Sequence, residues 1–317
     1  MFEDLNLLYK IATLYYESGY TQDEISKKVT MSRPMISRAL DKARQIGIVR
    51  ISVVPPSDFA DLSSTIAKGL GISNVIVAPS INATGNDGLD RINDVTEAAA
   101  RFLEREVSSG MNVGLGWGNT IYEMVNKLRK KPFVDKNKPN ITPLVGSIGD
   151  THSEYQCSVI VNKAADMLNA TAYYYNISML EPYTPEQIAY FKSRYMDIYE
   201  IWEHLDMAVI GLGAYSEKSL GTYPLSEYSQ EYRNKLKENN LIGDVVGYFF
   251  NDQGLIGKNG VETISRISSS MIKAAKRIVC VCCGTQKIDS IKTAAKLHLY
   301  NTLITDYKTA KELKESL

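Results

Sequence analysis

The chain has 317 residues, of which 44% are hydrophobic and 23% charged, as in an ordinary globular protein. Its 36 basic and 36 acidic residues balance, which argues against a protein that coats nucleic acid through overall positive charge. No apolar run approaches the ~20 residues that span a bilayer, and the start MFEDLN does not resemble a signal peptide. We therefore expect a cytoplasmic protein with no membrane partner.

Residues 8–53 have the layout of a winged helix-turn-helix, in which short helices joined by a tight turn precede a strand. In the first helix, apolar residues recur at helical spacing, and Gly19 can end it (Leu8, Ile11, Leu14, Tyr15). Thr21 and Glu24 predict a capping box at the start of the second helix, because each side chain can bind a free backbone amide. Ile25 and Val29 are expected to face inward on that helix.

The third helix has the features of a recognition helix. Ser32 is expected to cap it, and Pro34 stands in its first turn, where no amide donor is needed. Its apolar stripe is Ile36, Leu40 and Ala43, and its opposite face is polar and basic. Residues 21–50 contain seven basic and three acidic residues, a net charge of +4 on a neutral chain. The residues predicted to contact DNA are Thr21, Gln22, Ser32, Arg33, Pro34, Ser37, Arg38 and Lys42. The alternative is a helical hairpin with a solvated basic face.

The three cysteines of RIVCVCCG raise the possibility of a metal site. On a strand, Cys280 and Cys282 point to one face and Cys283 to the other, so they cannot easily converge on one ion. We therefore expect buried cysteines acting as small hydrophobic residues, and no metal.

After Pro55-Pro56, which we expect to close the wing, a helix is predicted to link two domains. Short apolar runs then alternate with amphipathic segments. The runs are 74–78, 112–116, 141–145, 172–175, 207–211, 277–283 and 301–304, and the helical patterns include 91–107, 119–129, 156–168, 184–202, 287–297 and 307–316. This alternation predicts an α/β domain with a parallel sheet covered by helices on both faces. We divide the chain into a DNA-binding domain (1–55) and an effector-binding and oligomerisation domain (56–317).

Four of these runs end in glycine-containing turns: Gly116–Thr120, Gly146–Gly149, Gly211–Gly213 and Gly284–Lys287. In open parallel sheets, ligands bind beyond the carboxyl ends of the strands. Glycine lets backbone amides approach an anion, and the start of a helix adds a favourable dipole. The turns, among them Gly116, Trp117, Gly118, Gly146 and Ser147, therefore predict a phosphate or polyol site, although such glycines also serve packing alone.

No Walker A loop is present, and Gly114, Gly116 and Gly118 have the wrong spacing for a dinucleotide fingerprint. Nucleotide cofactors are therefore disfavoured, and we expect none.

At this point the chain resembles the SorC family (SorC/DeoR-type) of bacterial transcriptional regulators, over nearly its whole length. The resemblance is carried by LYYESGYTQDEISKKVTMSRPMISRAL, VGLGWGNT, LVGSIG, VIGLGAYS, GDVVGYFFNDQG, CCGTQKIDSI and LYNTLITD, in the family's order. It implies a Rossmann-like C-terminal domain similar to sugar-phosphate isomerases and deaminases, which senses a sugar phosphate without converting it. It also implies a tetramer that binds operator DNA.

The resemblance further implies site residues. Gly118, Asn119 and Thr120 match the family's phosphate loop, Asp244 matches an acid that accepts hydrogen bonds from sugar hydroxyls, and Lys287 matches a lysine that reaches the phosphate. Trp117 and Gln156 are further candidates for the pocket lining. The alternative roles are structural: Thr120 caps its helix, Asp244 holds a turn, and Lys287 is a solvated helix start.

Val145 departs from relatives that have a lysine or an arginine at this position. A valine forms no Schiff base and holds no second phosphate, so a monophosphorylated ketose or polyol, or an unphosphorylated sugar, is favoured. The expected function is a repressor or activator of a carbohydrate operon. One alternative is an isomerase or deaminase with an accessory module, but we identify no acid/base pair for it. Another is an adaptor whose helix-turn-helix contacts protein.

Overall fold

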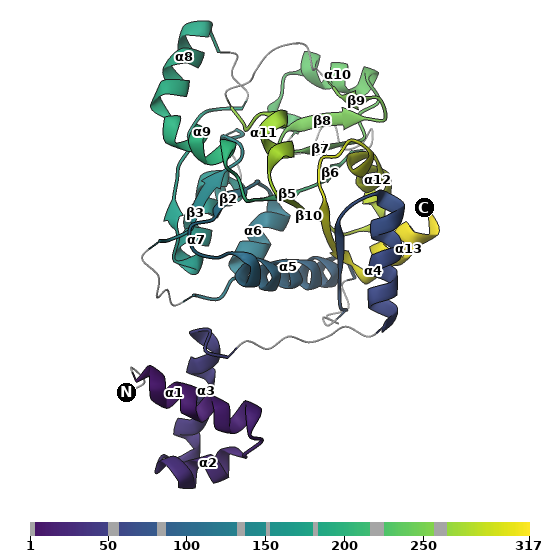
Figure 1. The fold of residues 1–317 in the computed structure, drawn as a ribbon. Coiled ribbons are helices and arrows are strands. Elements are labelled where there is room, and N and C mark those ends of the chain that lie inside the picture. The colour runs from purple at the N-terminus through teal and green to yellow at the C-terminus, as the bar shows by residue number, and fades with distance from the viewer. Residues whose placement is uncertain are drawn as a thin grey trace.

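The computed structural model describes residues 4–49, 57–80, 87–131, 137–149, 153–179, 183–215, 225–256 and 265–317. The N-terminal module contains α1 (Leu5–Ala12), α2 (Gln22–Val29) and α3 (Arg33–Gln45), with a π-helical turn over Thr13–Glu17 that continues α1 (Figure 1). The predicted wing strand and Pro55-Pro56 lie largely outside the described residues.

The three helices enclose a small apolar core of their own: Leu8, Ile11, Ala12, Ile25, Ile36, Ala39, Leu40 and Ala43. This confirms most of the predicted inward stripe. Leu14 and Tyr15 are only partly buried, because they lie in the π-helical turn, where the wider winding rotates side chains away from an α-helical stripe.

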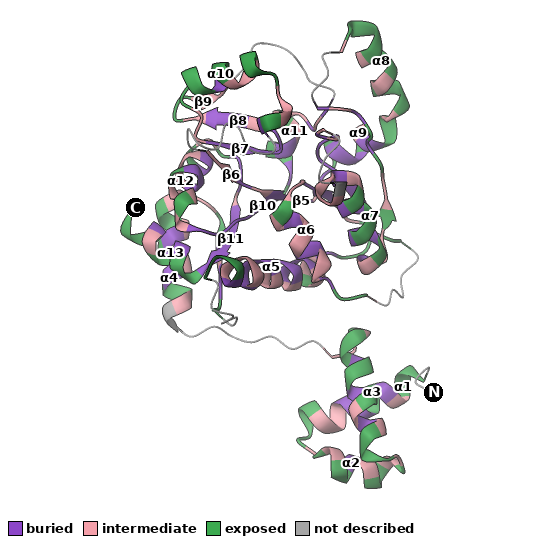
Figure 2. Cartoon of the chain, turned by 180° about the vertical axis from the view of Figure 1, so that it is seen from behind, coloured by how far each residue is buried: buried purple, intermediate pink, exposed green. Residues whose placement is uncertain are grey.

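The rest of the chain forms a seven-stranded parallel sheet in the order β1-β11-β10-β5-β2-β3-β4. Its strands are β1 (Asn74–Ala78), β2 (Asn112–Leu115), β3 (Asn140–Pro143), β4 (Thr171–Ala172), β5 (Met207–Gly211), β10 (Arg277–Val281) and β11 (Thr302–Asp306). Each predicted apolar run therefore overlaps a strand, although the run 172–175 shares only Ala172 with β4. The strands read as apolar on successive positions because helices cover both faces of the sheet (Figure 2).

The helices of this domain are α4 (Ser57–Leu70), α5 (Asp87–Glu106), α6 (Asn119–Asn126), α7 (Cys157–Leu168), α8 (Pro185–Arg194), α9 (Met196–Glu203), α10 (Gln230–Glu238), α11 (Ser269–Ala274), α12 (Ile288–Lys296) and α13 (Tyr307–Glu315). On one face of the sheet, α5, α6 and α7 pack over Val209 and its neighbours. On the other face, α4, α9, α12 and α13 pack over Ile210. The helix α4, which we predicted as a connector, thus belongs to this core through Leu62 and Ile66.

A second, antiparallel sheet was not predicted. It contains β6 (Gly213–Ala214), β7 (Gly243–Val245), β8 (Tyr248–Asn251) and β9 (Gly254–Leu255), in that order. Because β6 follows β5 after one residue, this sheet begins at the carboxyl edge of the parallel sheet.

The helix predicted over 184–202 is divided into α8 and α9 at Tyr195, whose backbone (φ −110°, ψ 28°) leaves the helical region. The Tyr195 ring packs edge-on against Tyr175, with the ring centroids 4.8 Å apart. The break redirects the chain so that α9 buries Trp202 in the core. None of the helices in the described ranges has the length and apolar character needed to cross a bilayer.

Candidate DNA-binding and effector-binding sites

The turn between α2 and α3 has the geometry of a helix-turn-helix. The capping box is present: the Glu24 amide donates to Thr21 Oγ1 (3.3 Å), and the Thr21 amide donates to Glu24 Oε2 (2.8 Å). The Thr21 amide and the Thr21 hydroxyl (2.9 Å) both donate to the Glu24 carboxyl and lower its pKa, since they favour its charged form. Thr30 ends α2 in the left-handed conformation (φ 55°), which makes the short turn possible.

The polar face of α3 is open to solvent. Ser32, Arg33, Pro34, Arg38 and Lys42 are exposed, and Ser37 is half-buried. Ser32 occupies the N-cap position, but its side chain makes no capping hydrogen bond. We expected that bond, and its absence leaves the hydroxyl available to an external group.

Most basic side chains of this face are not engaged within the module. Arg33 makes a long contact with Asp23 (Nε to Oδ1, 3.7 Å), and both side chains are 66% exposed. The structure gives no ion pair for Arg38 or Lys42 within residues 4–49. Thr21 is exposed at the start of α2, and the adjacent Gln22 is half-buried. The predicted DNA-contacting residues therefore lie at the start of α2 and along the exposed face of α3.

The four glycine-containing turns follow four neighbouring strands. The central part of the sheet order is β10-β5-β2-β3, and each of these parallel strands is followed by one of the turns. The chain runs outward from β2 to β3 and β4 and then returns to β5, so the strand order reverses between β2 and β5. A reversal of this kind is where open parallel sheets bind ligands.

The turn after β2 leads directly into α6. Gly118 is the N-cap of α6, with φ 101° and no side-chain cap. The Tyr155 carbonyl accepts from the Gly118 amide (3.3 Å), and the first helical bond is from the Tyr122 amide to the Gly118 carbonyl. The amides at the start of α6, including those of Asn119 and Thr120, have no acceptor within the helix. Asn119 is exposed and Thr120 is half-buried.

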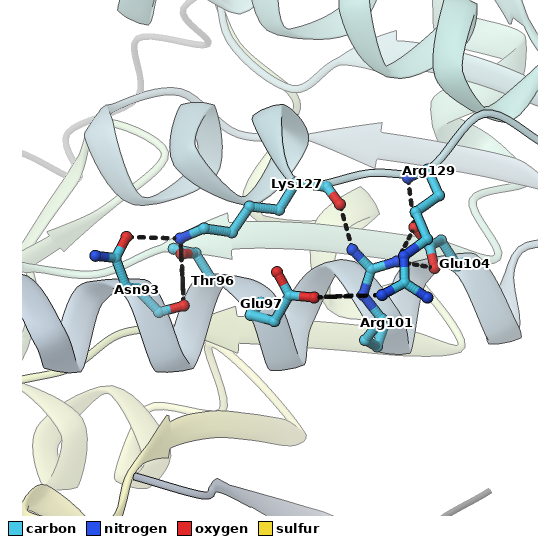
Figure 3. A network of polar contacts seen from close by, with 7 residues as sticks. All are labelled: Asn93, Thr96, Glu97, Arg101, Glu104, Lys127 and Arg129. Carbon is cyan, nitrogen blue, oxygen red and sulfur yellow. Dashed lines mark hydrogen bonds and ion pairs between the residues drawn. The ribbon is translucent and has the colours of Figure 1, made fainter. Parts of the chain in front are cut away.

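The other end of α6 is anchored to α5 by a polar network (Figure 3). Lys127 donates to the Asn93 side chain (2.9 Å), and Arg101 donates to the Lys127 carbonyl and to Glu97 (2.8 Å). Burial lowers the pKa of the Lys127 ammonium group. The helix that begins at the candidate phosphate loop is therefore fixed at its far end.

The turn after β3 is hydrogen-bonded to the backbone of two other segments. The Gly146 amide donates to the Ser265 carbonyl (2.7 Å), and the Ser147 amide donates to the Ile177 carbonyl (2.9 Å). A Cβ atom on Gly146 would lie 1.8 Å from the Ile177 oxygen, so only glycine fits here. Gln156 uses its amide to bind the Ile148 backbone, as donor (2.8 Å) and as acceptor (3.1 Å).

Asp244 lies buried on β7, and each of its carboxyl oxygens accepts one hydrogen bond. Its Oδ1 accepts from the Tyr215 hydroxyl (2.8 Å), and its Oδ2 accepts from the Gly247 amide (3.2 Å). Burial raises the pKa of the Asp244 carboxyl despite these bonds and the nearby cations Lys287 and Arg266. Desolvation of the partly buried Tyr215 phenol, with the nearby Asp244 carboxyl, raises its pKa well above the usual value.

Lys287 comes from the turn after β10 and reaches across to the turn after β5. Its Nζ donates to the Leu212 carbonyl (2.6 Å). The Ser290 hydroxyl donates to the neighbouring Gly213 carbonyl (2.6 Å), and Gly213 pairs with Asp244 in the small sheet. Asp244 and Lys287 thus both contact the segment Leu212–Gly213 that follows β5.

Arg266 was missed by the sequence analysis. It pairs with Val145 in an isolated antiparallel bridge, beside the Gly146 turn. One guanidinium nitrogen donates to the Gly247 carbonyl (2.9 Å), the group stacks on the Tyr248 ring (4.1 Å), and its buried Nε has no partner among the described residues. A cation therefore stands opposite Val145, where the sequence argument counted none. No local pattern around residue 266 signals this placement.

The cysteines behave as expected. All four are free and buried. Cys280 and Cys282 contribute to the core on one face of the sheet and Cys283 to the core on the other. Within the described ranges, no group of side chains has the composition of a metal site.

Hollows among the described residues include one at each edge of the parallel sheet. One, of about 330 Å³, lies at the amino edge of the sheet, where β1, β10 and β11 begin, and includes Arg105 and Arg277. The other, of about 340 Å³, lies between the small sheet and α12 and includes Tyr215 and Asp289. The first is at the wrong edge for the glycine-containing turns, and the second borders the Tyr215–Asp244 pair.

Comparisons with known proteins give a consistent result. Residues 54–314 match the family described as "Putative sugar-binding domain". The chain is 25% identical to the deoxyribonucleoside regulator of Bacillus subtilis, covering 99% of both chains, and 25% identical to the sorbitol operon regulator of Klebsiella pneumoniae, covering 98% of both. The crystal structure of the full-length sorbitol operon regulator SorC from Klebsiella pneumoniae matches with a TM-score of 0.72 and 23% identity, covering 98% of this chain and 99% of that one.

These relatives bear on the enzyme alternative. They are named as regulators, and the matches extend over both the N-terminal module and the α/β domain. The reading of the chain as an isomerase or deaminase with an accessory module is therefore not supported.

Proposed function

The chain belongs to the sugar-binding domain family of SorC-type transcriptional regulators, and we propose that it controls a carbohydrate-catabolism operon by binding operator DNA under the control of a sugar phosphate. One observation supports this most: an open basic helix face and four adjacent glycine-containing turns occur in the same chain. We assign DNA binding to residues 1–55 and effector binding with oligomerisation to residues 56–317. The regulator acts in the cytoplasm, where operator DNA and phosphorylated sugars occur together.

DNA contact is assigned to the exposed face of α3 with the start of α2. Arg38 and Lys42 are one helical turn apart and open to solvent, so they can reach bases or phosphates of a major groove. Thr21, Gln22, Ser32 and Ser37 flank them and can donate to phosphates. Arg33 is available because its contact with Asp23 is long and solvated. Pro34 starts the helix without a free amide.

The effector is a monophosphorylated sugar or polyol. The unbonded amides at the start of α6, with the Thr120 hydroxyl, suit one phosphate group. Gly116 and Gly118 keep that approach free of side chains, and Trp117 lies between them at the rim. Asp244 is buried and bound by Tyr215 and Gly247, so we assign it to holding the small sheet and to accepting a sugar hydroxyl.

The cations near Asp244 bear on two classes of effector: those that condense as aldehydes and those that have two phosphates. Lys287 and Arg266 lie near Asp244 and balance its charge, and Arg266 has a buried Nε without a partner in the described residues. Val145 still excludes a Schiff base, so an aldehyde-condensing effector is disfavoured. Arg266, however, offers a second anion contact, so Val145 alone does not exclude a second phosphate. We assign the monophosphorylated class because the start of α6 provides one phosphate site. We assign Gln156 a positioning role, because its amide is occupied by the Ile148 backbone.

Regulation follows from thermodynamic linkage between effector binding and DNA binding. An effector that favours one quaternary arrangement changes DNA affinity by the same coupling factor, whether the outcome is repression or activation. A helix-turn-helix dimer reads half-sites one or more helical turns apart. We infer a homo-tetramer, because a dimer of dimers can hold two such pairs.

The test separates the two sites with two variants of the full chain. Arg38→Ala should weaken binding to the promoter fragment that the wild type retains from its own genome by ~5- to 100-fold, the loss of one base or phosphate contact. It should leave the stabilisation by sugar phosphates unchanged. Thr120→Ala should abolish that stabilisation, measured as a rise in melting temperature across a panel of sugar phosphates, while promoter binding persists.

The outcomes are distinguishable. Loss of both properties in both variants would contradict the assignment to two separate sites. Steady product formation from any sugar phosphate in the panel would revive the enzyme alternative. Lys10→Ala, an exposed change on α1 outside the residues assigned to DNA contact, is the control for DNA binding.

A further inference from the structure

The helix α8 projects from the body of the C-terminal domain (Figures 1 and 2). None of its residues is buried, although Ile188 and Phe191 pack partly against the core. Tyr190, in the middle of the helix, is 58% exposed. Its ring contacts Phe191 on the same helix (centroids 5.4 Å apart), so more than half of this aromatic side chain remains in solvent on a protruding helix.

The outward residues of α8 are arranged symmetrically about Tyr190. On this outward face, Glu186 lies four residues before Tyr190 and Arg194 four residues after it, with Gln187 and Ser193 three residues to either side. All of these residues are exposed. If two copies of α8 lie antiparallel with the two Tyr190 residues at the centre, each Glu186 meets Arg194 of the other copy.

We propose that α8 binds a second copy of this chain by this antiparallel contact, with Tyr190 on the two-fold axis. The face is self-complementary, as a two-fold symmetric interface must be. Each Tyr190 meets the other Tyr190, and each acidic Glu186 meets a basic Arg194. An antiparallel pair also aligns the helix dipoles favourably, because the acidic start of one helix lies against the basic end of the other. A second copy of α8 reproduces the spacing of Glu186 and Arg194 about Tyr190 without any further requirement.

The area that the α8 contact can bury is too small for this contact to hold two copies together by itself. Two tyrosines bury at most ~300–500 Å² between them, whereas a stable interface needs at least ~1,200 Å² in total. The α8 contact alone therefore does not hold a dimer together. It is an additional contact between copies that associate elsewhere, and a contact of this strength is readily made or lost.

The position of α8 also depends on the candidate effector site. The segment Ile177–Met179 is hydrogen-bonded to Ser147 on both sides, through the Ser147 amide (2.9 Å) and the Met179 amide (2.8 Å). The Tyr183 hydroxyl, just before α8, donates to the Ser178 carbonyl (2.8 Å), and its ring contacts Phe191 of α8 with centroids 5.7 Å apart. A series of hydrogen bonds and one ring contact thus joins the turn after β3 to α8.

The experiment uses disulfide cross-linking of the full chain, without DNA and without effector. The four native cysteines are buried, so a single engineered cysteine is the accessible thiol. Tyr190→Cys should form a disulfide-linked dimer under mild oxidation, because residues on a two-fold axis between packed helices come within disulfide range. Met196→Cys is the matched control: Met196 is 59% exposed, but it begins α9 beyond the break at Tyr195, so it lies outside the proposed α8 contact.

A charge exchange tests the register. In the Tyr190→Cys background, Glu186→Arg and Arg194→Glu should each slow cross-linking by at least ~3-fold, since each places like charges opposite one another. The double change should restore the original rate. Equal cross-linking of Tyr190→Cys and Met196→Cys, or failure of the double change to recover the rate, would overturn the proposal. Neither result depends on whether the chain binds DNA or sugar phosphates, so the failure of this proposal and of the proposed function can be told apart.

Discussion

The buried carboxyl group of Asp244 shows how one side chain at the candidate effector edge is held. It accepts hydrogen bonds from Tyr215 and from the Gly247 amide, yet desolvation dominates and raises its pKa. A carboxyl whose pKa is higher in the folded than in the unfolded state keeps its full contribution to stability only below the unfolded pKa. That contribution is lost as the pH rises through the folded value.

We therefore predict a distinct pH profile for Asp244→Asn. As the pH rises from ~4 towards neutrality, the wild type must ionise a buried group and the variant need not, so the stability of the variant relative to wild type should increase. Each unit by which the folded pKa exceeds the unfolded one corresponds to ~1.4 kcal/mol. Melting temperatures of both proteins across this range measure the difference.

Asp206→Asn is the control of opposite sign. Asp206 is partly desolvated, but hydrogen bonds from Lys276 (2.6 Å) and the Asn112 amide (2.9 Å) lower its pKa. Its contribution is present above the unfolded pKa and lost as the pH falls through the folded value, so this variant should lose stability relative to wild type as the pH rises. Parallel profiles for the two variants would contradict the assignment of opposite shifts.

Site residues were predictable to different degrees. Thr21 and Glu24 were read directly from the sequence, since a capping box is a local pattern, and the structure contains it. Tyr215 and Arg266 were not, because their importance comes from partners far along the chain: Asp244 for Tyr215, Val145 and Gly247 for Arg266. Gln156 was predicted as a residue of the site, but its bonds to Ile148 could not be read from its position in the sequence.

At the scale of elements, the network between α5 and α6 fixes the helix that begins at the candidate phosphate loop (Figure 3). Arg101 is its centre: it donates to Glu97 and Glu104 on its own helix and to the Lys127 carbonyl beyond the end of α6. Its side chain is 26% exposed and that of Glu104 only 16%. Removing Arg101 would leave Glu104 partly buried without its cation.

We expect Arg101→Ala to destabilise the protein by ~1–3 kcal/mol, the usual cost of a broken hydrogen-bonded ion network that leaves a desolvated group. The matched control is Arg105→Ala, one turn further along α5. Arg105 is 61% exposed and pairs with the adjacent Glu106, so its loss should cost less than ~1 kcal/mol. Chemical denaturation of both variants measures the difference, and equal costs would show that the network does not anchor α6.

The elements themselves were predictable where one physical rule dominates. The central strands were recognised because burial on both faces makes them continuously apolar, as in Met207–Gly211. The small sheet was missed because its strands have two to four residues, too few to show an alternating pattern. The break at Tyr195 was missed because it depends on packing against Tyr175, which is distant in sequence.

At the scale of the whole molecule, connected contacts link the candidate effector site to the proposed contact between copies. The turn after β3 is bonded to Ile177–Met179, and Tyr183 joins that segment to α8. The aromatic side chains Tyr175, Tyr195 and Trp202 pack behind it, with Tyr175 in contact with both others. Closely packed groups of this kind do not deform continuously, so a shift at the turn is passed to α8 as a change of position.

The last prediction tests this connection on the proposed α8 contact. A sugar phosphate that raises the melting temperature of the full chain should change the cross-linking rate of Tyr190→Cys by at least ~5-fold, the lower range of coupling between two sites. Adding Tyr183→Phe removes the hydroxyl that bonds to Ser178 and should reduce that effect while the ligand still stabilises the protein. Tyr174→Phe is the control, because its hydroxyl bonds to Asn162 on α7 and not to the segment before α8. If the ligand changed cross-linking equally in both phenylalanine variants, the coupling would run through some other part of the sheet.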